Sequence, residues 1–240
     1  MINTQEIARK HIIVALDVPT LSEAVALTGQ LQEHVHGFKV GLQLLSAEGS
    51  SEVVSALGRL GVRIFYDAKF SDIPNTVASA SRAVSDKGVW MFDVHASAGR
   101  AAIEAAANNK GNSKLLAITV LTSLSSDECT RVFGRPSLEK VVEFARLASH
   151  CGADGVVCAQ SELEAIKESK DTSELLCVVP GIRPKWAATA DQSRYATPKL
   201  AISGGADYLV IGRPITRPPS SVGSPVEATM RIAEEICEAE

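Results

Sequence analysis

The chain has 240 residues, 45% of them hydrophobic, and a formal net charge of −4; this suits one sizeable domain, or two small ones, with an ample core. The mild acidity and the lack of basic runs argue against a nucleic-acid partner, and no stretch approaches the ~20 apolar residues of a membrane span. The five cysteines are scattered without a Cys-x-x-Cys pair, and the polar first ten residues show no secretory signal, so we expect reduced thiols in a cytoplasmic protein.

Short apolar runs recur along the chain, each rich in Val, Ile or Leu, as is typical of strands buried on both faces. In chain order, we expect strands at His11–Asp17, Gly37–Gly41, Val62–Lys69, Met91–Ala96, Leu115–Thr122, Gly155–Ala159, Leu175–Pro180 and Tyr208–Gly212. Helical patterns between them predict helices at Leu21–Val35, Ser51–Leu60, Thr76–Lys87, Leu138–Cys151 and Pro225–Ala239. Ser224 suits the N-cap of the last helix and Pro225 its first position.

Eight strands that alternate with helices, with no linker between them, predict a single (β/α)8 TIM barrel over residues 1–240. An open doubly wound sheet is the alternative, although eight near-regular units favour closure. Barrel active sites lie at the C-terminal ends of the strands, where polar residues should therefore gather. In this sequence the strand ends carry Asp17, Lys39, Asp67, Lys69, His95, Thr122, Ser123, Arg183 and Arg213. The pattern predicts an enzyme, although for His95 a hydrogen-bonded structural role is the simpler interpretation.

The third expected strand ends in the run Asp67-Ala68-Lys69-Phe70-Ser71-Asp72, followed by Ile73-Pro74-Asn75-Thr76. Side chains alternate along a strand, so Asp67 and Lys69 share one face, which must tolerate charge. Asp72 lies just beyond, before Pro74, as suits the first turn of a helix. Because buried charges must be paired, we expect an alternating array of two lysines and two aspartates that includes Lys39. A purely structural ion-pair network is the alternative.

Two segments place glycine beside arginine: Val179-Pro180-Gly181-Ile182-Arg183-Pro184 and Ile211-Gly212-Arg213-Pro214. Glycine lets backbone N–H groups approach an anion, and arginine supplies a fork that matches phosphate oxygens. Barrels often bind phosphate after their seventh and eighth strands, so we predict a phosphate site here. Turn glycines with solvated arginines are the alternative. The long polar stretch 184–197 is a candidate lid over a bound ligand.

These motifs, together with Ala15-Leu16-Asp17 and Phe38-Lys39-Val40-Gly41, resemble those of the orotidine 5′-monophosphate decarboxylase family, in order from strand 1 to strand 8. Asp-x-Lys-x-x-Asp alone indicates only the wider suprafamily, whereas Ile-Pro-Asn-Thr, Lys39 and the Gly-Arg of strand 8 are specific. The resemblance implies decarboxylation of orotidine 5′-monophosphate to uridine 5′-monophosphate (UMP), the last step of pyrimidine nucleotide synthesis, without metal or organic cofactor.

The same resemblance implies the residue roles. Lys69 would donate a proton to C6 of the pyrimidine, Asp67 would lie against the substrate carboxylate, and Lys39 and Asp72 would complete the charged array. Ribose hydroxyls would bind Asp17 and Lys39, with Thr76 assisting. The remaining substrate-binding positions are Thr122 and Ser123 at the pyrimidine, Pro180, and Arg183, Gln192, Gly212 and Arg213 at the phosphate. Asp72 and Thr76 would reach into the neighbouring subunit's site, which implies a homodimer.

Two rival functions stay open from the sequence. A Mg²⁺-dependent member of the suprafamily, a keto-sugar phosphate decarboxylase or a hexulose-phosphate synthase, would carry a metal-binding glutamate on strand 2. This chain offers Lys39 there, a cation that would repel Mg²⁺. A non-catalytic nucleotide-phosphate-binding barrel would keep Arg213 but would not need Asp67, Lys69 and Asp72 together.

Overall fold

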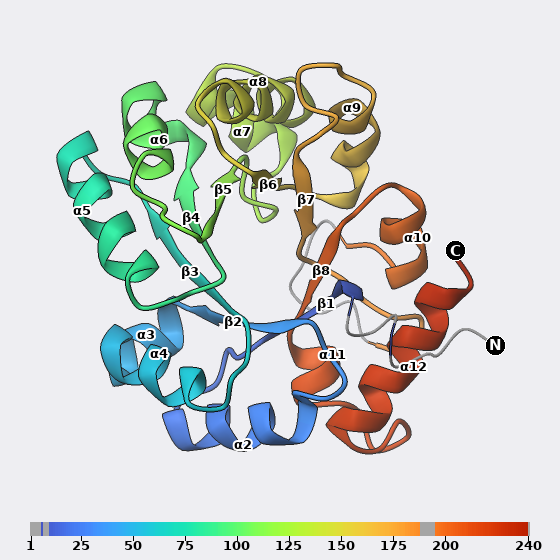
Figure 1. Ribbon diagram of the computed structural model, residues 1–240. Coiled ribbons are helices and arrows are strands. Elements are labelled where there is room, and N and C mark those ends of the chain that lie inside the picture. The colour runs from blue at the N-terminus through green and yellow to red at the C-terminus, as the bar shows by residue number, and fades with distance from the viewer. Residues whose placement is uncertain (1–5, 7–9, 188–194, 240) are drawn as a thin grey trace.

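The computed structural model describes residue 6, residues 10–187 and residues 195–239. Eight parallel strands form a closed barrel in which each strand pairs with the next and β1 pairs with β8. Figure 1 looks down the barrel and shows the strands at the centre, ringed by helices. The strands are β1 (Ile12–Ala15), β2 (Gly37–Gly41), β3 (Ile64–Phe70), β4 (Met91–His95), β5 (Lys114–Ile118), β6 (Gly155–Val157), β7 (Leu176–Val179) and β8 (Tyr208–Ile211). The predicted TIM barrel is confirmed, and the open sheet was the wrong alternative.

Several strands end earlier than their apolar runs, because the chain leaves the ladder to build the loops of the barrel mouth. The largest difference is in β5, which ends at Ile118 instead of Thr122. The Thr119 hydroxyl donates to the carbonyl of Val157 (2.7 Å), and a turn follows in which the N–H of Leu124 donates to the carbonyl of Leu121 (2.9 Å). Thr122 and Ser123 therefore lie in the loop after the strand.

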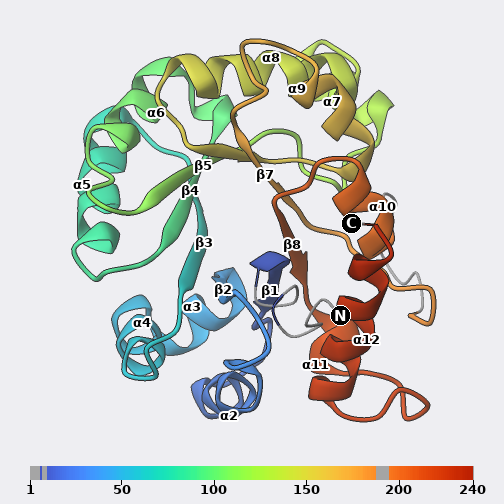
Figure 2. The same cartoon turned by 45° about the vertical axis from the view of Figure 1, so that its right-hand side comes forward.

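The helices are α2 (Leu21–Leu31), α3 (Leu42–Glu48), α4 (Ser50–Gly58), α5 (Pro74–Ser85), α6 (Arg100–Ala107), α7 (Ser126–Phe133), α8 (Ser137–His150), α9 (Leu163–Lys167), α10 (Pro198–Ser203), α11 (Arg213–Thr216) and α12 (Pro225–Cys237), with 3-10 turns at Ala96–Ala98 and Gln160–Glu162. The five predicted helices are present, and the Ser224 cap of α12 is confirmed, since its side chain accepts the N–H of Glu227. In both Figure 1 and Figure 2, α12 lies beside α2 and closes the outer ring. No helix among the described residues is long and apolar enough to cross a membrane.

Two apolar layers hold the barrel together. The larger lies between strands and helices, and the smaller fills the barrel interior with Ile13, Ala15, Phe65, Met91, Leu116, Val178 and Val210. Because inward-facing positions recur every second residue, the next inward residues toward the mouth are Asp17 after Ala15, Asp67 after Phe65 and Asp93 after Met91. The interior layer is thus an apolar floor beneath a polar mouth.

Candidate active site

A cavity of about 580 Å³ opens at the C-terminal ends of the strands. Nine of the residues expected in a site from the sequence line it: Asp17, Lys39, Asp67, Lys69, Thr122, Pro180, Arg183, Gly212 and Arg213. They come from β2, β3 and the segment after β1 on one side and from the segments after β5, β7 and β8 on the other. The cavity therefore joins the predicted charged array to the predicted phosphate corner.

Four side chains of alternating charge run along one wall of this cavity. Lys39 Nζ lies 3.0 Å from Asp17 Oδ1 and 3.0 Å from Asp67 Oδ2, and the Lys69 ammonium pairs with Asp67 Oδ1. Asp67 and Lys39 are almost fully buried, whereas Lys69 and Asp17 are more open. The order Asp17, Lys39, Asp67, Lys69 leaves the Lys69 ammonium at one end of the array, beside the cavity, paired with a single aspartate.

Mutual pairing keeps the buried members of the array charged. Burial opposes the charge of Lys39, but Asp67 and Asp17 outweigh it, so the pKa of Lys39 is raised. Burial likewise opposes ionisation of Asp67, but Lys39, a hydrogen bond with Asp93 and the charge of Lys69 together lower the pKa of Asp67. Both groups are therefore ionised at neutral pH.

A glycine makes room for the buried ammonium. Gly41, two residues beyond Lys39 on β2, has no Cβ, and one built there would lie 2.7 Å from Lys39 Nζ. It would also approach Asp67 Oδ2 at 3.6 Å. Even an alanine side chain at position 41 would thus displace the cation from between its two carboxylates.

Asp72, expected in the charged array, and Thr76, expected at the ribose, lie outside the cavity of their own chain. Asp72 is exposed, and its Oδ1 accepts the N–H of the adjacent Ile73 (2.7 Å). Thr76 is exposed on the first turn of α5. Within one chain, the second aspartate of the array is Asp17 and not Asp72. Ser123 also does not line the cavity, and Gln192 lies outside the described residues.

The opposite side of the cavity carries the predicted phosphate corner. After β7 the chain turns at Gly181, with φ of +76°, a conformation that favours glycine. The N–H of Arg183 donates to the carbonyl of Ala196 (2.8 Å), and the N–H of Ala196 donates to the carbonyl of Gly181 (3.3 Å). This pairing fixes Arg183 at the cavity wall, where Arg213, the first residue of α11, and Arg217 also lie. The three arginines thus concentrate positive charge on the side of the cavity away from Asp67.

His95 ends β4 and is half-buried. Burial and the charge of Lys69 lower the pKa of His95, and Asp67 opposes them. The imidazole is therefore neutral at pH 7 and adds no third cation to this wall.

Sequence reasoning missed several residues of the site. The cavity is also lined by Gln43 on α3, by Thr216 on α11 and by Arg217 directly after α11. Asp93 lies buried next to Asp67 and Lys69. The one available signal for Asp93 was a carboxylate in the middle of an apolar strand, at an inward-facing position two residues after Met91.

Comparison with known proteins matches this geometry to one family. Residues 10–228 match the family described as "Orotidine 5'-phosphate decarboxylase / HUMPS family". The chain is 43% identical over 96% of its length to orotidine 5'-phosphate decarboxylase of Heliobacterium modesticaldum, 97% of which is covered. It is 44% identical over 95% of its length to the enzyme of that name from Gloeothece citriformis, 98% of which is covered. The crystal structure of orotidine 5'-phosphate decarboxylase from Lactobacillus acidophilus superimposes with a TM-score of 0.78 at 33% identity, covering 95% of this chain and 99% of that one.

Proposed function

The chain belongs to the orotidine 5'-phosphate decarboxylase / HUMPS family, and on that basis we propose how its barrel mouth converts orotidine 5′-monophosphate into UMP and carbon dioxide. The activity is that of a carboxy-lyase in pyrimidine nucleotide synthesis. The observation that carries the assignment of roles is the array Asp17, Lys39, Asp67, Lys69 on the cavity wall.

The reaction needs a proton donor next to the carbon that loses its carboxylate. The bond from C6 to the carboxylate breaks, carbon dioxide leaves, and the electron pair stays on C6 as an sp² carbanion that the ring cannot delocalise. The Lys69 ammonium then donates a proton to C6, and solvent at the cavity mouth returns a proton to the amine. Asp67 pairs with the Lys69 ammonium and so holds the proton donor at the cavity wall.

One charge contact cannot supply the whole rate enhancement. A lysine about 4 Å from the developing carbanion contributes about 4 kcal/mol at an effective dielectric constant of ~20. Large enzymatic accelerations require up to ~23 kcal/mol. The remainder comes from binding energy at parts of the substrate that do not react, which is applied at C6 when the substrate is fixed.

The two sides of the cavity bind different parts of the substrate. Asp17 and Lys39 have polar atoms suited to ribose hydroxyls, and Thr122 lies at the edge of the β5 loop, where it meets the base. Arg183, Gly212 and Arg213 hold the phosphate, with Pro180 beside them. In this proposal, Ser123 and Gln192 complete the base and phosphate contacts. Residues 188–194 of the candidate lid, 184–197, lie outside the described residues.

We place Asp72 and Thr76 in the site of a partner subunit. Both are exposed and lie outside the cavity of their own chain. Ile73, between them, is 67% exposed and Leu42, after β2, is 56% exposed, so both offer apolar surface that a partner can cover. A homodimer that covers these residues would bring Asp72 beside Lys69 of the other subunit.

We further propose that the enzyme works in the cytoplasm. Cys158 and Cys177 are buried thiols outside any disulfide, although they lie close enough to interact. Thiols in that state suit a reducing compartment.

A Mg²⁺-dependent sugar-phosphate reaction fits the donor set less well. Between Asp17 and Asp67, where two carboxylates face each other, the Lys39 ammonium already makes both contacts at 3.0 Å. A divalent cation would have to displace Lys39 or share its carboxylates against charge repulsion. The lysine therefore favours the decarboxylase over the rival activity.

A spectrophotometric assay of the pure protein tests the proposal. Loss of orotidine 5′-monophosphate absorbance should proceed at an unchanged rate in EDTA, and Lys69→Ala should abolish it. The variant should still bind UMP, which separates loss of chemistry from loss of fold. Turnover that requires a divalent cation would favour the sugar-phosphate enzymes, and near-normal turnover by Lys69→Ala would remove the proposed proton donor.

A further inference from the structure

Strand β3 is irregular beside β4 at the point where the charged residues lie. The register advances from Tyr66 to Phe70 on β3 while it advances only from Phe92 to Val94 on β4. Residues 67–69 therefore stand opposite a single residue of β4. Such an irregularity re-aims side chains and is common next to active sites.

The backbone of Lys69 carries the bend. Its φ is +55°, and among the described residues it is the one non-glycine residue with positive φ. This conformation is unfavourable for a residue with a side chain and persists only where neighbours hold it. The neighbour here is Asp93, whose Oδ1 accepts the N–H of Lys69 at 2.7 Å.

Asp93 is buried beneath the charged array. The residue is 1% exposed and does not line the cavity, so it does not meet the substrate. Its register partner on β5 is the apolar Leu116. A carboxylate in such surroundings is costly unless it is paired or neutral. The polar partners of the Asp93 carboxylate are Asp67 and the backbone N–H of Lys69.

The second oxygen of Asp93 has no donor. Oδ2 is buried without a hydrogen-bond partner, and the Asp93 side chain interacts with the carboxylate of Asp67, itself an acceptor. A proton on Asp93 resolves this conflict, because Oδ2 then donates to Asp67. The pKa of Asp93 is accordingly raised well above its usual range, first by burial and then by the charge of Asp67 and a hydrogen bond with it. The charge of Lys69 and its N–H oppose this rise without cancelling it.

We propose that Asp93 is a positioning residue for the decarboxylation, which holds the backbone of Lys69 through Oδ1 and, as the neutral acid, steadies the Asp67 carboxylate through Oδ2. The inference rests on the proposed role of Lys69 as proton donor. Both partners of the Lys69–Asp67 ion pair are then fixed from below by one side chain. The ammonium is aimed into the cavity before the substrate arrives.

Two substitutions separate this role from mere packing. Asp93→Asn keeps an oxygen for the N–H of Lys69 and offers an N–H to Asp67, so it imitates the neutral acid. Asp93→Ala removes both contacts. We expect Asp93→Ala to lower kcat at least 30-fold while the Kd for UMP changes less than threefold, and Asp93→Asn to lower kcat less than fivefold.

Asp154 provides a matched control. Its Oδ2 accepts the N–H of Leu115 at 2.7 Å, the same kind of carboxylate-to-strand bond, at the opposite end of the barrel. Asp154→Ala should reduce thermal stability and leave kcat per folded molecule within twofold of the wild type. A comparable loss of kcat in this variant would show that any such bond supports activity and would overturn a specific role for Asp93.

The pH profile gives a readout that a packing role would not move. Around Asp93 the charged or titratable groups are Asp67 and Lys69 on β3, His95 on β4 and, through Asp67, Lys39 on β2. As pH rises, ionisation of Asp93 would set a second negative charge beside Asp67. The alkaline limb of kcat should therefore move to higher pH in Asp93→Asn, a measurement that remains available if Asp93→Ala fails to fold.

The possible results separate the positioning role of Asp93 from the proposed role of Lys69 as proton donor. Asp93→Ala with kcat within threefold of the wild type, beside an inactive Lys69→Ala, overturns the positioning role alone. An active Lys69→Ala overturns the proposed function. Asp93→Asn as impaired as Asp93→Ala, or with an unmoved alkaline limb, overturns the neutral-acid role.

Discussion

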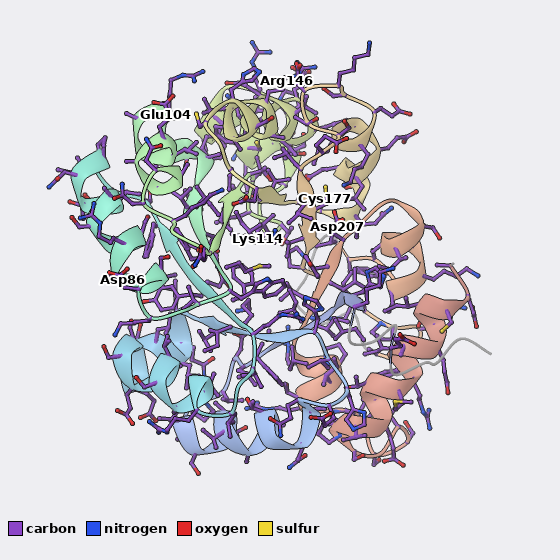
Figure 3. The ribbon with its side chains drawn as sticks, viewed as in Figure 1. Asp86, Glu104, Lys114, Arg146, Cys177 and Asp207 are labelled. Atoms are coloured by element: carbon purple, nitrogen blue, oxygen red, sulfur yellow. The ribbon has the colours of Figure 1, made fainter. Side chains whose placement is uncertain are left out.

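At the N-terminal ends of the strands, here called the barrel base, aspartates pair with one lysine and one backbone N–H each. Asp154, just before β6, lies 2.6 Å from Lys110 Nζ and 2.7 Å from the nitrogen of Leu115. Asp207, just before β8, accepts the N–H of Cys177 at 2.8 Å, and Figure 3 shows these two residues side by side. Each of these two carboxylates at the base thus has its hydrogen-bond donors close by.

At the mouth, by contrast, a single aspartate or lysine pairs with more than one partner. Asp67 serves two lysines, Lys39 serves two aspartates, and Asp93 has an oxygen with no donor. A locally complete pair stabilises a loop and leaves nothing for a ligand. An overlapping array next to a cavity keeps ammonium groups available to a substrate. The two ends of the barrel thus differ less in which charged residues they carry than in how those residues pair with one another.

The sharpest test of this contrast removes one lysine from each end. Lys39→Ala leaves Asp17 and Asp67 without their shared cation, and we expect kcat/KM to fall about 10³-fold or more. Lys110→Ala breaks a partly exposed pair worth about 1 kcal/mol, so Tm should fall by about 2–4 °C with kcat/KM unchanged. Steady-state kinetics and thermal melts check both. Equal losses of activity would erase the distinction between mouth and base.

A second test asks whether the mouth is completed by a partner subunit. Lys69→Ala and Asp72→Ala proteins should each be inactive, but after subunit exchange a mixed dimer has one site with both residues intact. With half of the dimers mixed and one site working in each, activity should recover to about a quarter of the wild type.

Mixing Lys69→Ala with Asp67→Ala is the control for that recovery. These two residues pair within one chain, so every site of the mixed dimer stays defective and no activity should return. Recovery in the control, or none with Asp72→Ala, would contradict the placement of Asp72 in the neighbouring site.

A third test compares arginines at the mouth and at the surface. Arg213→Ala removes a charged contact to the ligand phosphate, so the Kd for UMP should rise about 30-fold, equivalent to about 2 kcal/mol. Arg146, on α8, extends from the outer ring in Figure 3 and lies 3.9 Å from Asp171. Arg146→Ala should leave the Kd unchanged in calorimetric titration. An unchanged affinity in Arg213→Ala would reject the phosphate assignment.

A last test concerns how stability depends on pH. An acid whose pKa is raised in the folded state, like Asp93, binds a proton that the unfolded chain releases. Its contribution to the free energy of unfolding is full below the unfolded pKa near 3.8 and is lost as pH rises through the folded value. The wild type should therefore lose stability relative to Asp93→Asn, by at most about 1.4 kcal/mol per pH unit. Urea unfolding of both proteins between pH 4 and 8 should show this; a constant difference would contradict a neutral Asp93.

Much of the fold was predictable because it depends on local pattern. Buried parallel strands are continuous apolar runs, and all eight could be located from them. The short helices that follow strands directly, such as α3 after Gly41, were not expected, because so few residues carry no helical period. The end of β5 was also placed too late, since Val120 and Leu121 continue the apolar run after the ladder has ended.

For the candidate site, the sequence could indicate which charges lie at the mouth but not how they connect. Asp17, Lys39, Asp67 and Lys69 were expected from their positions at strand ends. The bulge that turns Lys69 to φ +55° depends on pairing between β3 and β4, and so does the role of Asp93. The proposed place of Asp72 in a partner's site depends on a second chain, whose position the residue pattern of one chain does not give.

The apolar floor of the barrel makes the site a dead end. Seven hydrophobic side chains fill the interior below the array. The nucleotide, carbon dioxide and the water that would reprotonate Lys69 must therefore all pass through the cavity mouth. In the proposed mechanism, carbon dioxide therefore leaves through the opening by which the nucleotide entered, and Lys69 regains its proton from solvent that enters by the same route.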